Sequence, residues 1–200
     1  MSDVLTLHHI PAHMKQFGLC LLGRAVADSS CSEMMRPFAH ASAVTMAAQA
    51  AEILIKAKVS EKSPLLIFAK LPPVPHQDRE LSLEDLFESA KSHMYDELPN
   101  LLWAATGLRI PNLPEYKSFG KLRNKIMHFA VPEAELTERT LSFAVSVMEP
   151  MVRDFWSESA IAYAEDYDEV IGEGYLEEQL VRFGIPIDRE LQTLFSSPKS

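Results

Sequence analysis

The sequence is short of glycine and of long apolar runs. Seven glycines in 200 residues are few for an all-β domain, which needs many tight turns. No apolar run reaches the roughly 18 residues that span a bilayer. The N-terminal stretch "MSDVLTLHHIPAH" lacks the basic flank and apolar core of a signal peptide. We therefore expect a cytoplasmic protein with no membrane segment.

Cysteine is also scarce, and no cluster of metal ligands is visible. Cys20 and Cys31 form no C-x-x-C pair, which is typical of a cytoplasmic protein with reduced thiols. Cys20 lies among apolar residues, which indicates a core position rather than a nucleophile. His9 and His13 have the i,i+4 spacing of some metal ligands, but Pro11 lies between them. We expect no metal and no cofactor.

Positive charge is the third shortage. The chain has 19 Lys and Arg against 28 Asp and Glu, a net charge of -9, and a pI near 5.3. This balance argues against a bulk nucleic-acid binder, which usually carries a basic face. It leaves room for an enzyme that contacts a few phosphates through a local patch. The apolar fraction of 47% is enough for a folded core.

Apolar periodicity predicts helices along most of the chain. The first two are expected over residues 12–28 and 40–58, and a third from a cap at Ser82 through Met94. A fourth should start at about Glu115 and extend no further than Val131. The fifth should run from a cap at Thr137 through Phe155, with a kink or split at Pro150. No internal repeat and no βαβ alternation is present. The predicted fold is all-α: a helical bundle over 1–160, with an acidic helical appendage over 161–200 that packs on or near it.

One predicted helix, residues 40–58, is rich in alanine and has a narrow polar stripe. Thr45, Gln49, Glu52 and Lys56 follow one another at steps of four, three and four residues. These steps place the four side chains on one face of a helix that is otherwise apolar. We expect this stripe to face water or a polar cleft.

The stretch "KLRNKIMHFA", residues 121–130, concentrates polar and cationic side chains in an acidic chain. Asn124 precedes His128 by four residues, so the two side chains share a helix face. Arg123 precedes His128 by five residues, which places it about 140° around the helix from His128. Either the helix is irregular here or a second copy of the chain supplies the partner, as a two-fold dimer would.

Two interpretations of this stretch stay open on the residues alone. Histidine transfers protons near neutral pH and arginine offers a fork of donors to phosphate, a pair that suits metal-free RNA cleavage by the 2′-hydroxyl. Asn124 would hold the imidazole in one tautomer, and Lys121 and Lys125 would bind substrate. The alternative is a helix C-terminus with cations that the macrodipole favours, His128 serving as a capping residue.

The motif "RNKIMH" resembles the R-x4-6-H signature of the HEPN superfamily, with a polar residue directly after the arginine. The helix "AAQAAEILIKAKV" also resembles the early long helix of HEPN domains, and the order of the helices is similar. The resemblance extends over residues 12–157, is weaker over 60–115, and does not include the C-terminal appendage. The resemblance therefore rests on two features together: the motif itself, and an alanine-rich helix that lies at the distance from the motif expected for this superfamily.

The resemblance implies a function as well as a fold. HEPN domains are all-α bundles that usually dimerise through their motif helices, and many are metal-independent ribonucleases of toxin–antitoxin or antiviral defence systems. Arg123 and His128 would then be catalytic and Asn124 supportive, with RNA as substrate and an antitoxin or other regulator as a further partner. Glu52 is a candidate for orienting Arg123 or His128. Silent members of the superfamily bind a nucleotide or a partner protein instead.

Seven acidic residues lie between positions 165 and 178 of the predicted appendage. One hypothesis places them over the cations of residues 121–125, where they would compete with RNA. A purely structural role for the whole bundle is the third interpretation of this sequence.

Overall fold

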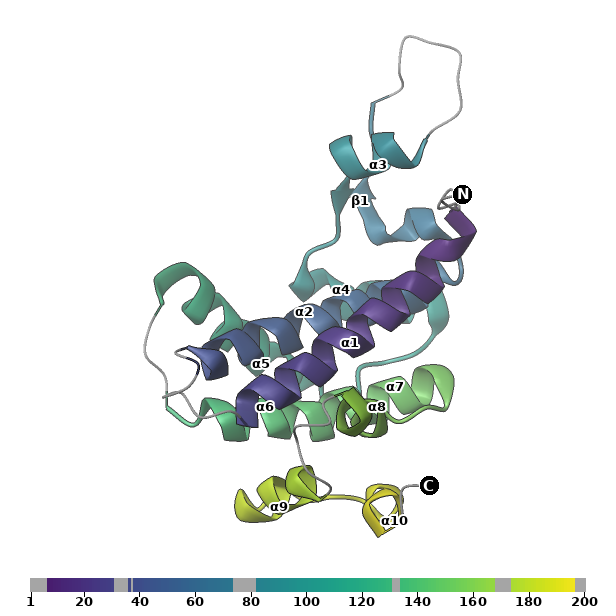
Figure 1. Ribbon diagram of the computed structural model, residues 1–200. Helices are drawn as coiled ribbons and strands as arrows, with labels where there is room; N and C mark the ends of the chain where they lie inside the picture. The colour runs from purple at the N-terminus through teal and green to yellow at the C-terminus, as the bar shows by residue number, and fades with distance from the viewer. Residues whose placement is uncertain are drawn as a thin grey trace, which may run out of the picture. The chain divides into compact units, whose positions relative to one another are not determined.

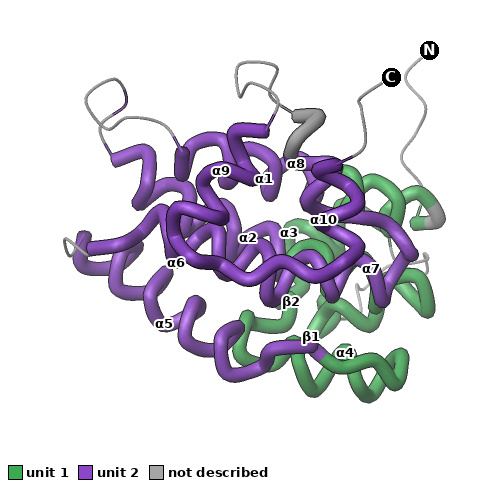
Figure 2. Tube along the Cα trace, turned by 90° about the horizontal axis from the view of Figure 1, so that it is seen from below, with its two compact units in different colours: residues 1–16, 52–109 green, residues 17–51, 110–200 purple. Residues whose placement is uncertain are grey.

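The computed structural model describes residues 7–30, 36, 38–73, 82–130, 134–167 and 174–196, and the structural statements below concern these residues. Most of them are helical (Figure 1), and the predicted all-α class is confirmed. The chain divides into two compact units (Figure 2). Unit 1 consists of Met1–Gln16 and Glu52–Arg109, and unit 2 of Phe17–Ala51 and Ile110–Ser200.

The first two predicted helices are confirmed as α1, Ile10–Ser30, and α2, Ala39–Ser60. Both contribute residues to both units. Alanine gives α2 a high helix propensity and lets neighbouring helices approach closely. In the part of α2 that belongs to unit 2, most alanines are buried, including Ala43, Ala47 and Ala51.

The polar stripe of α2 was predicted to face water or a polar cleft, and its C-terminal end differs from that prediction. Gln49 is exposed, and Thr45 and Glu52 are half-buried, but Lys56 is buried. The Lys56 Nζ donates to Glu52 Oε1 at 2.6 Å and to Ser92 Oγ at 3.2 Å. The lysine can be buried because these two oxygens within unit 1 replace water as its partners.

Unit 1 contains a two-stranded antiparallel sheet that the sequence did not predict. The strands β1, Phe68–Lys70, and β2, Lys91–Ser92, pair with an irregular register. Between them lies α3, Leu83–Ser89, whose predicted cap at Ser82 is confirmed as a capping box with Asp85. The extension of this helix to Met94 is wrong, because the chain becomes extended at Ala90 and pairs as β2.

The remaining elements of unit 1 are short. They are the 3-10 turns Leu7–His9 (η1), Pro64–Ile67 (η2) and Tyr95–Glu97 (η3), and the helix α4, Leu98–Thr106. Helix α4 ends at Gly107, whose φ of 77° is the left-handed conformation that glycine adopts without steric cost.

The secondary-structure elements among the described residues of unit 2 are all helices, joined by short turns and loops (Figure 2). Its helices after α2 are α5, Leu113–Phe129; α6, Leu136–Phe143; α7, Glu149–Trp156; α8, Ala160–Tyr167; α9, Tyr175–Arg182; and α10, Arg189–Ser196. The predicted apolar stripe from Leu141 to Phe155 is buried, as expected for a core helix.

The predicted disturbance at Pro150 takes the form of a wider helical turn. A π-helical segment, Ala144–Met148 (η4), connects α6 to α7 without a break in the helical path. Proline lacks an amide hydrogen, and in a regular helix its ring would clash with the carbonyl of Ser146, four residues earlier. The i→i+5 pattern of the π-turn removes that conflict.

Side chains from two later helices bind the C-terminus of α1. Thr137 Oγ1 donates to the carbonyl of Ser29 at 2.8 Å, and the Tyr175 hydroxyl donates to the carbonyl of Ser30 at 3.2 Å. These carbonyls lack partners within their own helix. The predicted capping role of Thr137 is wrong, because Glu135 occupies the N-cap of α6 and Thr137 lies in its first turn.

The C-terminal helices α9 and α10 pack within unit 2. Leu176, Leu180 and Leu191 are buried, and the predicted division of the two helices around Gly184 and Pro186 is confirmed. The domain boundary at residue 160 stays a prediction. Most of the acidic run over 165–178 lies outside the residues whose side chains are described. Among the described residues, no helix is long and apolar enough to cross a membrane.

Candidate functional site

The motif helix α5 begins at Leu113, two residues before the predicted start near Glu115, and it ends before Val131, as predicted. At its start, the Oδ1 of Asn112 accepts a hydrogen bond from the backbone amide of Glu115 at 3.3 Å, and Pro114 lies in the first turn. At its end, Ala130 adopts a left-handed conformation with φ of 46°, and its amide donates to the carbonyl of Ile126. His128 therefore lies in the last turn, as predicted.

One face of α5 fixes the helix to the core of unit 2. Tyr116, Phe119 and Leu122 are buried, and the Phe119 ring stacks on Phe143 with centroids 3.9 Å apart and planes 5° apart. The stacked pair joins α5 to α6. These contacts hold the N-terminal two thirds of the helix.

A charged pair supports the same junction. Arg139 Nη2 donates to Ser118 Oγ at 3.1 Å. Burial raises the pKa of the nearby Glu115 carboxyl, and the positive charge of Arg139 partly opposes that rise. Arg139 thereby couples the first turns of α5 to α6.

The last turn of α5 is not covered by unit 2. Met127 is 55% exposed and Phe129 is 75% exposed, although both are large apolar side chains. His128 between them is also exposed, and its ring makes an edge contact with Phe129 at 6.3 Å between centroids. The imidazole is therefore accessible, in a setting that is half apolar.

The structure brings some of the predicted site residues together. Arg123 Nη1 donates to Asn124 Oδ1 at 2.9 Å, so the guanidinium and the amide form one unit. Arg123 is half-buried, whereas Asn124, Lys121 and Lys125 are exposed. The helix is regular from Leu113 to Phe129, so one chain keeps Arg123 about 140° around the axis from His128.

Two exposed residues of α5 outside the predicted set extend the row of lysines along the helix. Lys117 and Phe129 continue the i,i+4 spacing of Lys121 and Lys125 in both directions. That spacing is visible in the sequence, but the exposure of Phe129 becomes evident only from the fold.

Glu52 belongs to unit 1, where its carboxylate pairs with Lys56 at 2.6 Å. The proposed orientation of Arg123 or His128 by Glu52 stays a prediction. No group of three potential metal ligands occurs among the described residues, which include His9 and His13.

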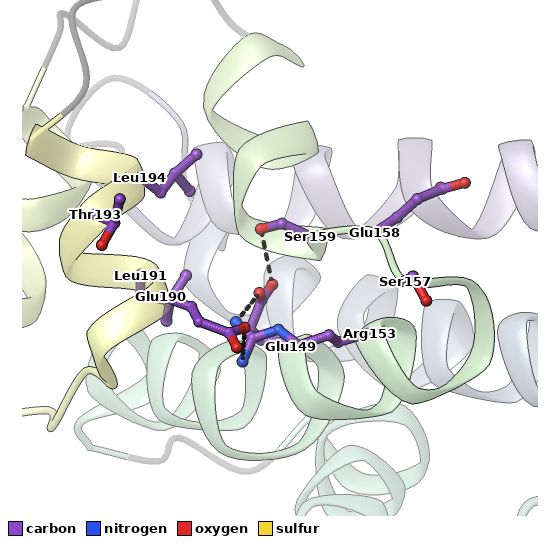
Figure 3. Close-up of a pocket in the computed structure, with 9 residues that line it drawn as sticks. All are labelled: Glu149, Arg153, Ser157, Glu158, Ser159, Glu190, Leu191, Thr193 and Leu194. Carbon is purple, nitrogen blue, oxygen red and sulfur yellow. Dashed lines mark hydrogen bonds and ion pairs between the residues drawn. The ribbon is translucent and has the colours of Figure 1, made fainter.

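A pocket in unit 2 contains none of the predicted site residues. This pocket has a volume of about 480 Å³ and lies between α7, the loop that leads into α8, and α10. Its lining residues are Glu149, Arg153, Ser157, Glu158, Ser159, Glu190, Leu191, Thr193 and Leu194 (Figure 3). The spacing of Glu149 and Arg153, four residues apart in an apolar helix, was the one sequence signal for it.

A network of paired charges occupies one wall of this pocket. Glu149 is 1% exposed and accepts hydrogen bonds from Arg153 at 2.7 Å, from Ser159 Oγ and from the amide of Ile161. Arg153 also pairs with Glu190 at 2.7 Å (Figure 3). It pairs with Asp188 as well, at 2.8 Å. The network satisfies a buried carboxylate and ties α10 to α7, which is a structural role.

Comparison with known proteins adds no relationship to this picture. No protein-family model, no curated protein and no solved structure matches the chain.

Proposed function

We propose that this protein is a metal-independent endoribonuclease of the HEPN type that works as a homodimer, in a toxin–antitoxin or antiviral defence system. The observation that carries the proposal is the exposed His128 in the last turn of α5, with Asn124 on the same face and Lys121 and Lys125 beside it. An accessible imidazole next to cations suits proton transfer on a phosphodiester. The assignment to defence rests on the resemblance of the motif alone.

The proposed chemistry uses the 2′-hydroxyl of the RNA as nucleophile. Its oxygen attacks the adjacent phosphorus, its proton passes to a base, and the bond from phosphorus to the 5′-oxygen breaks as that oxygen takes up a proton. The products are a 2′,3′-cyclic phosphate and a 5′-hydroxyl. His128 serves in proton transfer, and Arg123 stabilises the charge that develops on the phosphorane oxygens.

A second copy of the chain is part of this proposal. His128 and Arg123 lie about 140° apart on one helix, so Arg123 of one chain would serve His128 of the other. The exposed Met127 follows Arg123 by four residues and therefore shares its face. An exposed methionine beside a site that needs a partner suits a contact between two copies.

Cleavage assays with single-stranded and transfer RNA test the enzyme. His128→Ala should lower the cleavage rate by about 10²–10⁴-fold and leave the fold intact, because the side chain is exposed. His13→Ala, which removes an exposed histidine of unit 1, is the matched control and should cleave normally. Wild-type cleavage should survive EDTA. Activity that His128→Ala retains, or that EDTA stops, would refute the mechanism.

Mixing two inactive variants tests the composite site. Equal amounts of Arg123→Ala and His128→Ala should recover about a quarter of wild-type activity, because half of the dimers are mixed and each has one intact site. Light scattering should show a dimer at micromolar concentration. A monomer, or no recovery on mixing, would contradict a site shared between two chains.

The second candidate is a catalytically silent dimer that binds a nucleotide or a partner protein. The net charge of -9 favours it, since RNA binding by an acidic chain depends on a small local patch. Nucleotide binding without cleavage of any RNA would support this candidate over the enzyme.

A further inference from the structure

A single row of side chains runs along the exposed face of α5. Lys117, Lys121, Lys125 and Phe129 follow one another at intervals of four residues, and all four are exposed. Such an i,i+4 row forms a continuous ridge on a helix, with about 6 Å between successive members. We call this row the α5 ridge, and His128 lies beside its C-terminal end.

The helix macrodipole does not account for the ridge. The dipole acts within the last turn, and His128 is the one basic residue of that turn. Lys117 lies just beyond the first turn, where the dipole gives a cation no advantage. Helix α5 nevertheless holds four of the chain's 19 Lys and Arg residues, against one carboxylate, Glu115. The positive charge is therefore concentrated on this surface of an otherwise acidic protein.

Phe129 ends the ridge with an exposed aromatic face. Its ring is 75% exposed and contacts the His128 ring edge-on at 6.3 Å, with an angle of 68° between the planes. Exposed aromatic rings next to cations are the usual platform for unstacked bases, because every base has a π-face. A base stacked on Phe129 would bring its own phosphodiester close to the imidazole.

The geometry points to the α5 ridge as a binding track for single-stranded RNA, with phosphates on Lys117, Lys121 and Lys125 and one base stacked on Phe129. This inference rests on the proposed ribonuclease function and names its substrate class. Helix α5 runs along the margin of unit 2 (Figure 2), so a strand can follow the helix axis. From Lys117 to His128 the helix rises about 16 Å, the length of about five stacked nucleotides.

Single-stranded rather than duplex RNA fits the ridge for two reasons. The ridge is one line of cations, whereas proteins that bind duplex RNA contact the phosphates of both strands across successive grooves. A base in a duplex is also stacked and paired, and cannot reach Phe129 unless it is flipped out.

The binding experiment uses the His128→Ala protein, so that the RNA stays intact. Fluorescence anisotropy with a labelled, unstructured oligouridylate is measured over a series of salt concentrations. Replacing Lys117 by Ala in this background should flatten the plot of log K against log salt by about 0.7, the value for one lost phosphate contact on a single strand. Lys62→Ala, which removes an exposed lysine of unit 1, is the matched control and should leave the slope unchanged.

Phe129→Ala tests the stacking contact separately from charge. It should weaken binding by about 5- to 150-fold without a change in salt slope, and Phe129→Trp should restore binding. Light scattering should give the same oligomeric state for both variants. A change of oligomeric state on Phe129→Ala would overturn the stacking role and assign the ring to a contact between chains.

The outcomes of the binding and cleavage experiments distinguish a failure of this inference from a failure of the proposed function. Binding that depends on Lys117 and Phe129, in a protein that cleaves no RNA, would support the track and refute the enzyme. Cleavage with binding that Lys117→Ala and Phe129→Ala leave unchanged would refute the track and leave the enzyme. A blunt RNA duplex should compete weakly for the labelled strand. Equal affinity for the duplex, or no binding of RNA at all, would overturn the inference.

Discussion

Single residues of α5 combine opposite environments within two helical turns. Arg123 is half-buried and hydrogen-bonded to Asn124, while His128, five residues later, is exposed in the last turn. This contrast arises because the core of unit 2 covers α5 only up to about Leu122. Residue identity alone would describe these polar side chains as equivalent surface positions. Their burial separates a positioned guanidinium from an accessible imidazole.

Thr140 offers a test of the core at the scale of one atom. Its side chain is fully buried in α6, and its hydroxyl has no hydrogen-bond partner among the described residues. Thr140→Val keeps the branched shape and removes the unsatisfied group, so the free energy of unfolding should rise by about 1 kcal/mol. Urea denaturation measures the change. A less stable variant would mean that the hydroxyl has a partner.

At the scale of elements, α5 is a helix that is fixed at one end and uncovered at the other. Phe119 stacks on Phe143 in the fixed part, whereas Met127 in the last turn is exposed. The same helix therefore contributes both to the stability of unit 2 and to the surface that carries the proposed site.

Two substitutions in α5 should separate these roles. Phe119→Ala should lower the free energy of unfolding by about 3–5 kcal/mol, because it leaves a cavity under the Phe143 ring. Met127→Ala should change it by less than about 0.5 kcal/mol, as an exposed position does, and should weaken self-association. Chemical denaturation and light scattering give the two readouts. Equal destabilisation by both variants would mean that the last turn is packed after all.

At the scale of the whole chain, the paired charges around Arg153 connect the C-terminal helix α10 to α7 within unit 2. The backbone amide of Leu191 and the guanidinium of Arg153 hold the pKa of Asp188 below its ordinary value of 3.8. A carboxyl with a lowered pKa stabilises the fold above its ordinary pKa and loses that contribution as the pH falls through the lowered value.

Acid unfolding should reveal the contribution of the Asp188–Arg153 ion pair to stability. Between about pH 5 and about pH 2, the stability of the wild type should fall more steeply than that of Asp188→Asn, which cannot lose a negative charge. The difference should be small, because Asp188 is about half exposed and water screens it. Thermal unfolding at each pH measures both proteins. Parallel curves would show that Asp188 gains nothing from Arg153 in solution.

Removal of the C-terminal helices should destabilise the protein rather than simply expose the basic face of α5. A chain that ends at residue 167 loses the buried Leu176, Leu180 and Leu191, at about 1.5–3 kcal/mol for each leucine, and the bond from Tyr175 to Ser30. The melting temperature of the truncated protein should therefore fall sharply. An unchanged melting temperature would support an appendage that is independent of the bundle.

Much of the fold could be predicted because its signals are local. The Ser82 capping box, the alanine content of α2 and the proline after α5 act within one or two turns, where sequence neighbours are spatial neighbours. The short strands could not be predicted in the same way. Lys91 and Ser92 form a strand only because Phe68–Lys70 lies beside them, and that pairing is a property of the tertiary fold.

The sequence by itself determined the helical class, the C-terminal limit of α5 and the i,i+4 row of lysines, because periodicity and helix-ending residues act on nearby residues. The tertiary structure decided which of those side chains meet and which face water. It buries Lys56 against Glu52 and Ser92, joins Arg153 to Asp188, and leaves Met127 and Phe129 exposed beside His128. These outcomes depend on segments distant in the chain that pack together only when the whole unit folds.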